Sequence, residues 1–193
     1  MSSKNRSKWT WKTLAALALI LVPAALFSPS CASTLPSRNP TGELFPSVSG
    51  QSLEKESIEI PGEFAGAPAV LLVGYKQGAQ FDIDRWVMGL LQAEVAGRLV
   101  ELPTIPALVP TMISGWIDDG MRSGIPREEW SAVITLYGKA AKPVAALTGT
   151  EAGRRARVIV LDTEGKVAWF DDEGYSPRKA LEVAELTRQL AGR

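Results

Sequence analysis

The stretch that decides the fold is residues 68–86, PAVLLVGYKQGAQFDIDRW. Residues 69–75 form a continuous apolar run of strand length, which is typical of a strand buried on both faces of a sheet. After the short loop 76–80, apolar residues recur at helical spacing over 81–97, which predicts an amphipathic helix. The order strand, loop, helix predicts an α/β domain with this strand at its centre.

The rest of the chain repeats the same alternation of strands and helices. Further strands are predicted at 57–61, 99–102 and 132–137, and further helices at 106–122 and 138–148. Because each helix is long enough to connect neighbouring strands of a sheet, the pattern predicts a mixed or parallel central sheet flanked by helices.

The predicted helix 106–122 carries one apolar stripe and ends on two acids. Its stripe consists of Leu108, Met112, Ile113, Trp116 and Ile117. Core packing explains most of the tryptophans of the body, which are Trp86, Trp116, Trp130 and Trp169. Asp118 and Asp119 are interpreted as the solvated end of this helix rather than as metal ligands.

The clearest supersecondary pattern is RVIVLDTEGKVAWF, residues 157–170. Residues 158–161 and 166–170 predict two strands, and 162–165 a turn with Gly165 at its positive-φ position. Ser176 and Pro177 then predict the start of a last helix, with Ser176 as its N-cap. The chain is therefore expected to end in a hairpin followed by a helix.

Residues 44–190, taken together, resemble the thioredoxin-like superfamily on its peroxiredoxin and alkyl-hydroperoxide-reductase side. The C-terminal hairpin and helix also resemble the mitochondrial ATP-synthase assembly chaperone family, a thioredoxin-fold group that lacks the redox cysteine pair. The resemblance implies a three-layer sandwich, α/β, with a mixed central sheet and an N-terminal hairpin before the first core strand. It also implies where a redox site would lie.

Two landmarks of that superfamily are missing from this sequence. The loop that should hold Cys-x-x-Cys, or Thr-x-x-Cys in peroxiredoxins, is KQGAQ at 76–80. Six residues before Asp162, where thioredoxins have a cis-proline and peroxiredoxins an arginine, stands Ala156. Arg155 and Arg157 flank it and are interpreted as a solvated pair. Both departures argue against thiol chemistry.

Composition excludes several classes of function. The 193 residues contain no histidine and a single cysteine, Cys31, which removes the commonest general base and makes a structural zinc site or an intrachain disulfide untenable. Haem ligation has no support, and no nucleotide-binding motif occurs, so no cofactor and no metal are expected. Four of 21 basic residues and none of 21 acidic ones precede Cys31, so the mildly acidic body predicts no nucleic-acid binding.

The N-terminal segment predicts export. Residues 1–12 are basic and 13–27 are apolar, which is typical of a signal peptide rather than of a spanning helix of about 20 residues. Three outcomes stay open: lipidation of Cys31 in a lipobox-like context, where Ser28 replaces the expected Leu; cleavage after Ala32; or an uncleaved anchor with Trp9 and Trp11 at the interface.

These patterns divide the chain into three parts. Residues 1–30 are a signal peptide or membrane anchor, 31–43 a Pro- and Ser-rich flexible tether, and 44–193 the thioredoxin-like domain. The body is expected in the cell envelope, on the periplasmic side of a bacterial membrane, lipid-anchored or else signal-anchored or secreted.

The functional hypothesis is a redox-inactive module, not an enzyme, that binds or assembles a protein partner and contacts the membrane through its N-terminal segment or a lipid on Cys31. Its expected binding edge consists of Tyr75, Lys76, Gln77, Gly78, Gln80, Asp82, Arg155 and Arg157.

The alternative is a cysteine-independent enzyme or a degenerate peroxiredoxin-like oxidoreductase. Asp82 and Asp84 are its candidate acid–base groups, but residues two apart on a helix point to different faces and do not converge. An acid at a helix start is moreover explained by capping and the helix dipole. No catalytic residue is therefore assigned.

Overall fold

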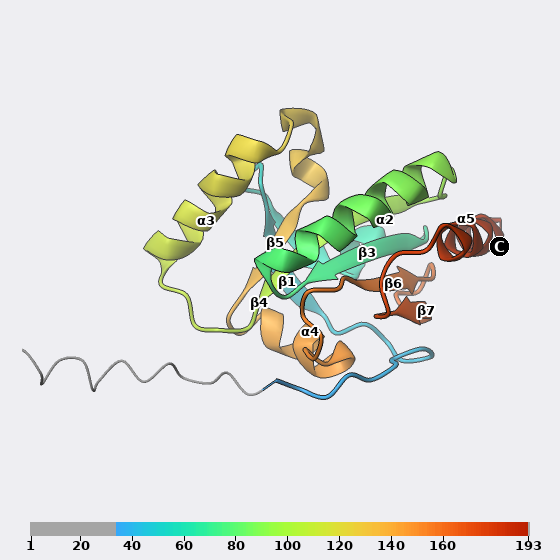
Figure 1. The fold of residues 1–193 in the computed structure, drawn as a ribbon, viewed down its shortest axis with the longest axis horizontal. Coiled ribbons are helices and arrows are strands. Elements are labelled where there is room, and N and C mark those ends of the chain that lie inside the picture. The colour runs from blue at the N-terminus through green and yellow to red at the C-terminus, as the bar shows by residue number, and fades with distance from the viewer. Residues whose placement is uncertain (1–33, 193) are drawn as a thin grey trace, which may run out of the picture. The chain divides into compact units, whose positions relative to one another are not determined.

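The computed structural model describes residues 34–192, which form a seven-stranded sheet in the order β2-β1-β5-β4-β3-β6-β7 (Figure 1). The strands are β1 (Val48–Ser52), β2 (Ser57–Ile60), β3 (Ala69–Gly74), β4 (Arg98–Ile105), β5 (Ile134–Tyr137), β6 (Arg157–Leu161) and β7 (Val167–Asp171). The helices are α2 (Gln80–Gln92), α3 (Thr111–Gly124), α4 (Ala141–Thr148) and α5 (Pro177–Ala191).

The sheet is mixed, as the sequence predicted. Strand β3 is parallel to β4, and β4 to β5, whereas β6 runs antiparallel to β3 and β7 antiparallel to β6. The N-terminal hairpin β1–β2 pairs antiparallel with itself and joins the sheet through β5.

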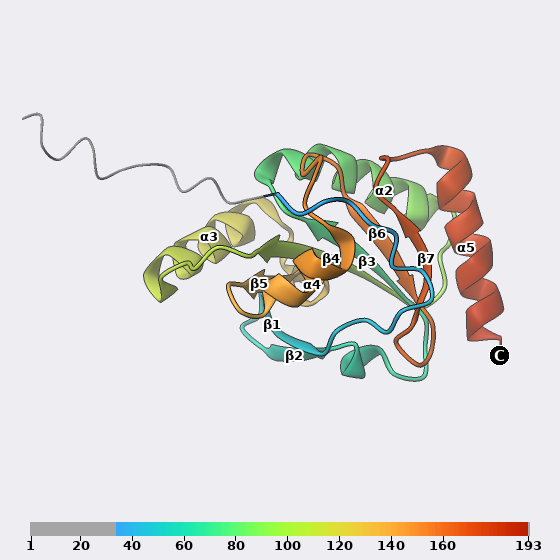
Figure 2. The ribbon, with the colours of Figure 1, turned by 90° about the horizontal axis from the view of Figure 1, so that it is seen from below.

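Helices cover both faces of the sheet, which confirms the three-layer architecture. Val70 and Leu72 of β3 lie in one core cluster with residues of α2 and α5, including the fully buried Trp86. Leu71 and Val73, on the opposite face, pack in a second cluster with Val144 of α4. Figure 2, seen from the α4 side, shows α4 in front of the sheet and α2 behind it. The alternation along β3 thus supplies both cores.

Two helix boundaries differ from the predicted ones by five residues each, more than any other. Helix α2 ends at Gln92 rather than at residue 97, and Gly97 makes the return with a φ of +84°. A Cβ on Gly97 would lie 2.0 Å from the carbonyl oxygen of Pro68, so only glycine fits there. Helix α3 begins at Thr111, because Pro110 is extended (φ −56°, ψ 143°) and precedes the first helical residue.

The orientation of α3 was not predicted correctly. Trp116 is 77% exposed rather than packed in the core. The one buried residue of α3 is Asp118, which accepts a hydrogen bond from the hydroxyl of Tyr137 at 2.7 Å and is therefore not solvated. In both ribbon views α3 lies apart from the other helices (Figures 1 and 2). A polar contact holds this helix where an apolar one was expected.

The C-terminal hairpin agrees with its prediction. Gly165 has a φ of +79° and donates its N–H to the carbonyl of Asp162, while the Asp162 carboxylate accepts the N–H groups of Glu164 and Lys166. Pro177 opens α5, and Ser176 occupies the N-cap position, although its side chain makes no capping hydrogen bond.

Residues 34–43 run along the body as an extended segment. Leu35 donates its N–H to the side chain of Thr150 and accepts the N–H of the same residue. Arg38 donates its N–H to the carbonyl of Thr148. Val167 accepts the N–H of Gly42 and donates its own N–H to the carbonyl of Glu43. These bonds fix where the described chain begins, at the end of α4.

Candidate functional site

The candidate site lies where β3 ends and β6 begins. Because these strands are antiparallel neighbours, with Val73 paired to Arg157, the loop 75–80 stands beside the loop 149–156. The loop 172–176 between β7 and α5 closes a third side. This is the end of the sheet at which the sequence placed the binding edge.

Residues 76–80, where a redox cysteine would lie, include no thiol and no hydroxyl side chain. Residues Gln77–Ala79 form a short 3-10 helix that leads directly into α2. Ala79 is buried, whereas Lys76, Gln77 and Gly78 are exposed. The loop thus offers amide and ammonium groups to solvent at the start of α2.

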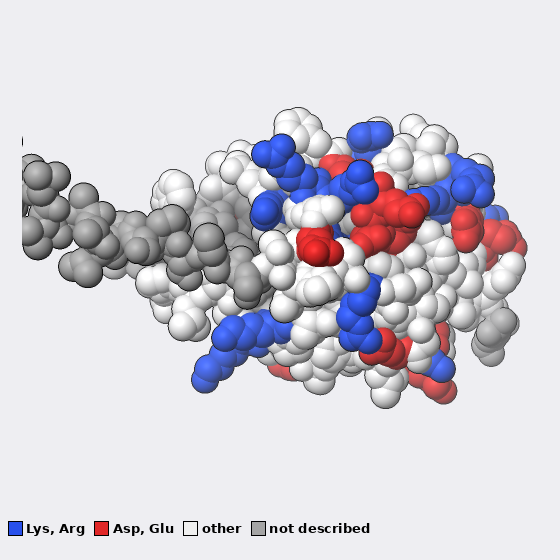
Figure 3. Space-filling model, turned by 60° about the horizontal axis from the view of Figure 1, so that its bottom comes forward, with Lys and Arg blue, Asp and Glu red and all other residues white. Residues whose placement is uncertain are grey.

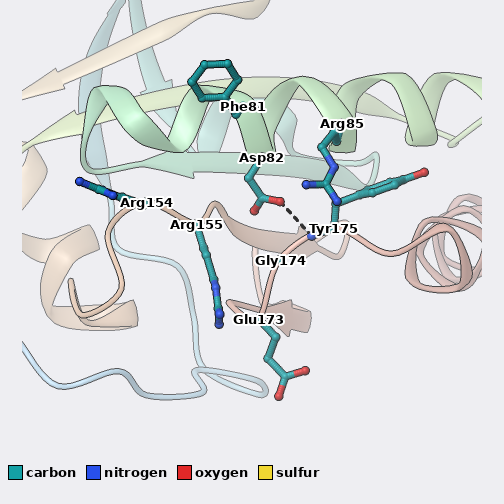
Figure 4. Close-up of a pocket in the computed structure, with 8 residues that line it drawn as sticks. All are labelled: Phe81, Asp82, Arg85, Arg154, Arg155, Glu173, Gly174 and Tyr175. Carbon is teal, nitrogen blue, oxygen red and sulfur yellow. Dashed lines mark hydrogen bonds between the residues drawn. The ribbon is translucent and has the colours of Figure 1, made fainter.

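Asp82 fastens the start of α2 to the two neighbouring loops. Its carboxylate accepts the N–H of Ala156 at 3.0 Å and the N–H of Tyr175 at 2.9 Å (Figure 4). Asp82 is the third residue of α2, and both N–H groups that its carboxylate accepts belong to other segments, so it does not cap its own helix. A proline at position 156 would have no N–H to donate; with alanine there, Asp82 satisfies a backbone donor that would otherwise be buried without a partner.

Arg157 is buried, contrary to its interpretation as part of a solvated pair. Its guanidinium donates to the carbonyls of Glu151, Ala152 and Arg155, which curls the preceding loop around it. Burial lowers the pKa of Arg157 below its usual value, because removal from water disfavours the charged form. Three carbonyl oxygens of the preceding loop accept the hydrogen bonds of its guanidinium, so Arg157 shapes the loop from inside.

Tyr75 is anchored between the two loops. Its hydroxyl lies 2.7 Å from that of Thr148, and the guanidinium of Arg157 lies 5.4 Å from its ring centre. Burial raises the pKa of Tyr75 to about 12, so the phenol stays protonated at neutral pH. A phenol in this state supports the loop and supplies no base.

The loops 76–80 and 151–156 also cross each other through two glycines. A Cβ on Gly153 would lie 3.2 Å from the side chain of Lys76, and one on Gly78 would lie 3.4 Å from Arg154. Each long basic side chain therefore passes over a glycine of the opposite loop. Arg154 was missed from the sequence because nothing in its own neighbourhood relates it to a loop 76 residues earlier.

Gln80 and Arg155 face other parts of this end of the molecule. Gln80 donates to the carboxylates of Asp84 and Glu101, at 2.8 and 3.4 Å, on the β4 side of α2. Burial raises the pKa of Glu101, and the bond from Gln80 partly opposes that shift. Arg155 extends on the opposite side, toward the loop 172–176 (Figure 4). The residues of the predicted binding edge therefore do not form one contiguous surface.

A shallow cavity of about 290 Å³ lies beside the hydrogen-bonded carboxylate of Asp82. Arg85 stands 5.6 Å from the ring centre of Tyr175 on one side of it (Figure 4). Its lining residues are Phe81, Asp82, Arg85, Arg154, Arg155, Glu173, Gly174 and Tyr175. Charges of both signs line it. Asp82 and Arg155 belong to the predicted binding edge, whereas residues 173–175 come from a segment remote from it in the sequence.

No group of three or more acidic, cysteine or histidine side chains capable of holding a metal occurs within residues 34–192. Over the same residues, no helix is long and apolar enough to cross a membrane. Cys31, the predicted lipidation site, lies outside the described residues.

Comparison with known proteins places the fold. No family model and no curated protein matches this sequence. Among solved structures, the thioredoxin domain of a thiol-disulfide oxidoreductase from Bacteroides vulgatus matches with a TM-score of 0.52 and 14% identity, over 78% of this chain and 97% of that one. BsSco, a member of the Sco family of cytochrome c oxidase assembly proteins, matches with a TM-score of 0.54 and 8% identity, over 80% and 98%.

A third similar structure is the exposed lipoprotein thioredoxin of Streptococcus pneumoniae, with a TM-score of 0.50 and 9% identity over 73% of this chain and 99% of that one. At these identities the comparison defines the fold. The chain has a thioredoxin-like fold, as the sequence predicted.

Proposed function

We propose that the protein is a redox-inactive, thioredoxin-like binding module of the cell envelope, tied to a membrane by its N-terminal segment. In this proposal the binding surface is the end of the sheet formed by loops 75–80 and 151–157. The partner is a protein segment that the module holds or helps to assemble, without covalent chemistry.

The observation that carries the proposal is the chemistry of the loop 76–80. A thioredoxin-like fold uses the helix start after β3 to activate a thiolate, because the helix dipole favours a negative charge there. In this chain the loop holds no cysteine, and the carboxylate of Asp82, which follows the loop, accepts hydrogen bonds from two backbone N–H groups. The loop therefore offers no thiolate that could act as a nucleophile in disulfide exchange.

The rigidity of the surrounding loops supports a binding role. Arg157, Tyr75 and Asp82 fix the loops from inside, while Gln77 and Gly78 stay exposed between them. A preformed surface loses little conformational entropy when a partner binds. The exposed amide of Gln77 can donate and accept hydrogen bonds with an extended backbone.

The N-terminal sequence supports the envelope location. A basic segment, an apolar run and then Cys31 make up the order expected of an exported lipoprotein, and one similar structure is itself an exposed lipoprotein thioredoxin. The assembly role is suggested by BsSco, whose own family assembles cytochrome c oxidase.

Photo-crosslinking in cells tests the binding surface. With the full chain carrying benzoylphenylalanine in place of Gln77, irradiation is expected to give a discrete adduct with one protein. The matched control places the same group at Glu59, which is also exposed but lies on the edge strand β2, with three strands between it and β3 in the sheet order. Identical adducts at both positions, or none at Gln77, would contradict the proposed surface.

Redox inactivity is tested separately with the purified protein. Insulin reduction and hydrogen peroxide consumption are expected to run at their uncatalysed rates for both the wild type and Cys31→Ser. A catalysed rate that Cys31→Ser abolishes would instead favour the degenerate oxidoreductase.

A further inference from the structure

Helix α3 is packed with its apolar side outward. Met112 and Trp116, one turn apart, are 87% and 77% exposed, and Ile113 between them is 48% exposed. The side that faces the body makes polar contacts: Asp118 accepts a hydrogen bond from Tyr137, and Arg122 donates one to the carbonyl of Leu53. A surface helix normally buries its apolar stripe, so an inverted helix of this kind marks a surface that something else covers.

The exposed stripe continues into the loop before the helix, where Leu108 is 80% exposed. We call Leu108, Met112, Ile113 and Trp116 together the α3 face. From residue 102 to residue 117 the sequence contains no charged side chain. The α3 face is therefore both apolar and free of charges in its own segment.

The α3 face lies at the end of the molecule where the described chain begins. A Cβ on Gly138 would lie 3.6 Å from Leu108, so Leu108 sits next to the start of α4. The end of α4 lies against Leu35 through Thr150, about 12 Å away for an eight-residue helix. Figure 3 shows Lys and Arg side chains on both sides of the point where the described chain begins, with Asp and Glu side chains between them.

Two of the exposed basic residues, Lys139 and Lys142, belong to the segment that Leu108 contacts. Basic side chains next to exposed Trp, Leu, Ile and Met form the combination that binds the interface of an anionic membrane, where apolar groups enter the headgroup layer and cations meet lipid phosphates.

We propose that the α3 face rests on a lipid bilayer with anionic headgroups, so that the domain touches the membrane as well as being tied to it. This inference rests on the membrane tether of the proposed function. Only six residues lie between Phe27, at the end of the apolar run, and Thr34, so the seven chain steps that join these two residues reach at most about 25 Å. The end of the domain that carries Thr34 therefore faces the bilayer.

A bilayer suits the α3 face better than a second copy of the chain. A stable dimer buries about 800 Å² on each partner. A tryptophan contributes about 150–250 Å², and three aliphatic side chains contribute less each, so the α3 face falls short of that area. A bilayer needs no matching surface, and the tether already holds it close.

Oxidative footprinting of the full chain tests this orientation. The chain is reconstituted into vesicles of phosphatidylethanolamine and phosphatidylglycerol, floated to recover bound protein, exposed to hydroxyl radicals and analysed by peptide mass spectrometry. Met88 of α2, which is 59% exposed, is the internal reference for Met112 at 87%. Exposure alone makes Met112 the faster to oxidise; contact with the bilayer is expected to make it at least threefold slower than Met88.

Two variants sharpen the readout. Leu108→Ser combined with Trp116→Ser is expected to raise Met112 oxidation at least threefold, whereas Leu181→Ser, an equally simple change at an exposed leucine of α5, leaves it protected. Phosphatidylcholine vesicles are expected to protect Met112 less, because they lack anionic charge.

Three results would overturn the inference. In the first, the chain floats with the vesicles but Met112 still oxidises faster than Met88, so the tether stands and the docking fails. In the second, protection of Met112 depends on protein density at constant lipid, and the occupant is another copy. In the third, the chain does not float, and both the tether and the docking fail.

Discussion

Helices α2 and α3 follow neighbouring parallel strands, yet α2 buries its apolar side chains and α3 exposes most of its own. Helix α2 buries Ile83, Trp86 and Leu90 against the sheet, whereas α3 buries an aspartate and exposes Met112 and Trp116. Helical spacing identifies the apolar side of a helix in both cases. It does not say whether the protein's own core covers that side.

The sheet beneath each helix explains the difference. Strand β3 pairs with β4 along its whole length from Ala69 to Gly74, and with β6 on its other side. Beneath α3, β4 meets β5 only at Thr104 and Ile105 and at one isolated bridge from Glu101. The contact between α3 and this part of the sheet is polar, from the Tyr137 hydroxyl to Asp118, and the apolar stripe of α3 stays exposed.

The largest expected effect is the difference in unfolding free energy between alanine variants of Trp86 in α2 and Trp116 in α3. Trp86→Ala removes a fully buried ring that packs edge-on against Trp169 and Tyr175, and is expected to cost about 3–5 kcal/mol of unfolding free energy. Trp116→Ala should change it by no more than about 0.5 kcal/mol. Urea unfolding of the detergent-solubilised chain, followed by circular dichroism, measures both. Equal losses would mean that the α3 face is packed within the protein after all.

The next effect compares the buried acids of the two helices. Asp82→Ala leaves the N–H groups of Ala156 and Tyr175 without an acceptor and is expected to cost about 2–4 kcal/mol. Asp118→Ala frees one hydroxyl, that of Tyr137, and should cost roughly 1 kcal/mol. Hydrogen exchange should speed up at Ala156 and Tyr175 only in Asp82→Ala. The opposite order of stability losses would contradict the fastening role of Asp82.

The smallest effect concerns alkaline pH. Burial raises the pKa of Tyr75 to about 12, and burial together with the bond to Asp118 raises that of Tyr137. A folded-state pKa above the unfolded value of about 10 gives stability that is complete below pH 10 and is lost as pH rises toward 12. For Tyr75 the loss should reach about 1 kcal/mol at pH 11.

Urea midpoints at pH 9 and pH 11 measure this loss, and Tyr75→Phe should reduce it while Tyr137 continues to contribute. Absorbance at 295 nm reports the titration itself. A wild-type midpoint that does not move over this range would show that neither phenol is held as the structure indicates.

The elements with strong local patterns could be predicted from the sequence. The run 69–75, the helix after it and the hairpin around Asp162 and Gly165 carry their own spacing and turn chemistry, and the structure has each of them. The absence of a cysteine from loop 76–80 was equally plain. These features depend on contacts that are local in the chain.

The features that were mispredicted depend on distant segments. Arg157 resembles any exposed arginine in sequence, and its burial follows from the carbonyls of a loop that curls back over it. Arg154 and Tyr175 join the site only because β6 and the start of α5 lie beside α2. Such neighbours are set by topology, which residue spacing alone does not report.

The bonds of residues 34–43 have a mechanical consequence. A pull on the chain at Thr34 would act first on the pair between Leu35 and Thr150, then on Arg38 and Thr148, and only afterwards on the pair at Val167. These hydrogen bonds would break in sequence rather than simultaneously. Each rupture would lengthen the N-terminal segment before force reaches β7, so the segment would extend before the sheet is loaded.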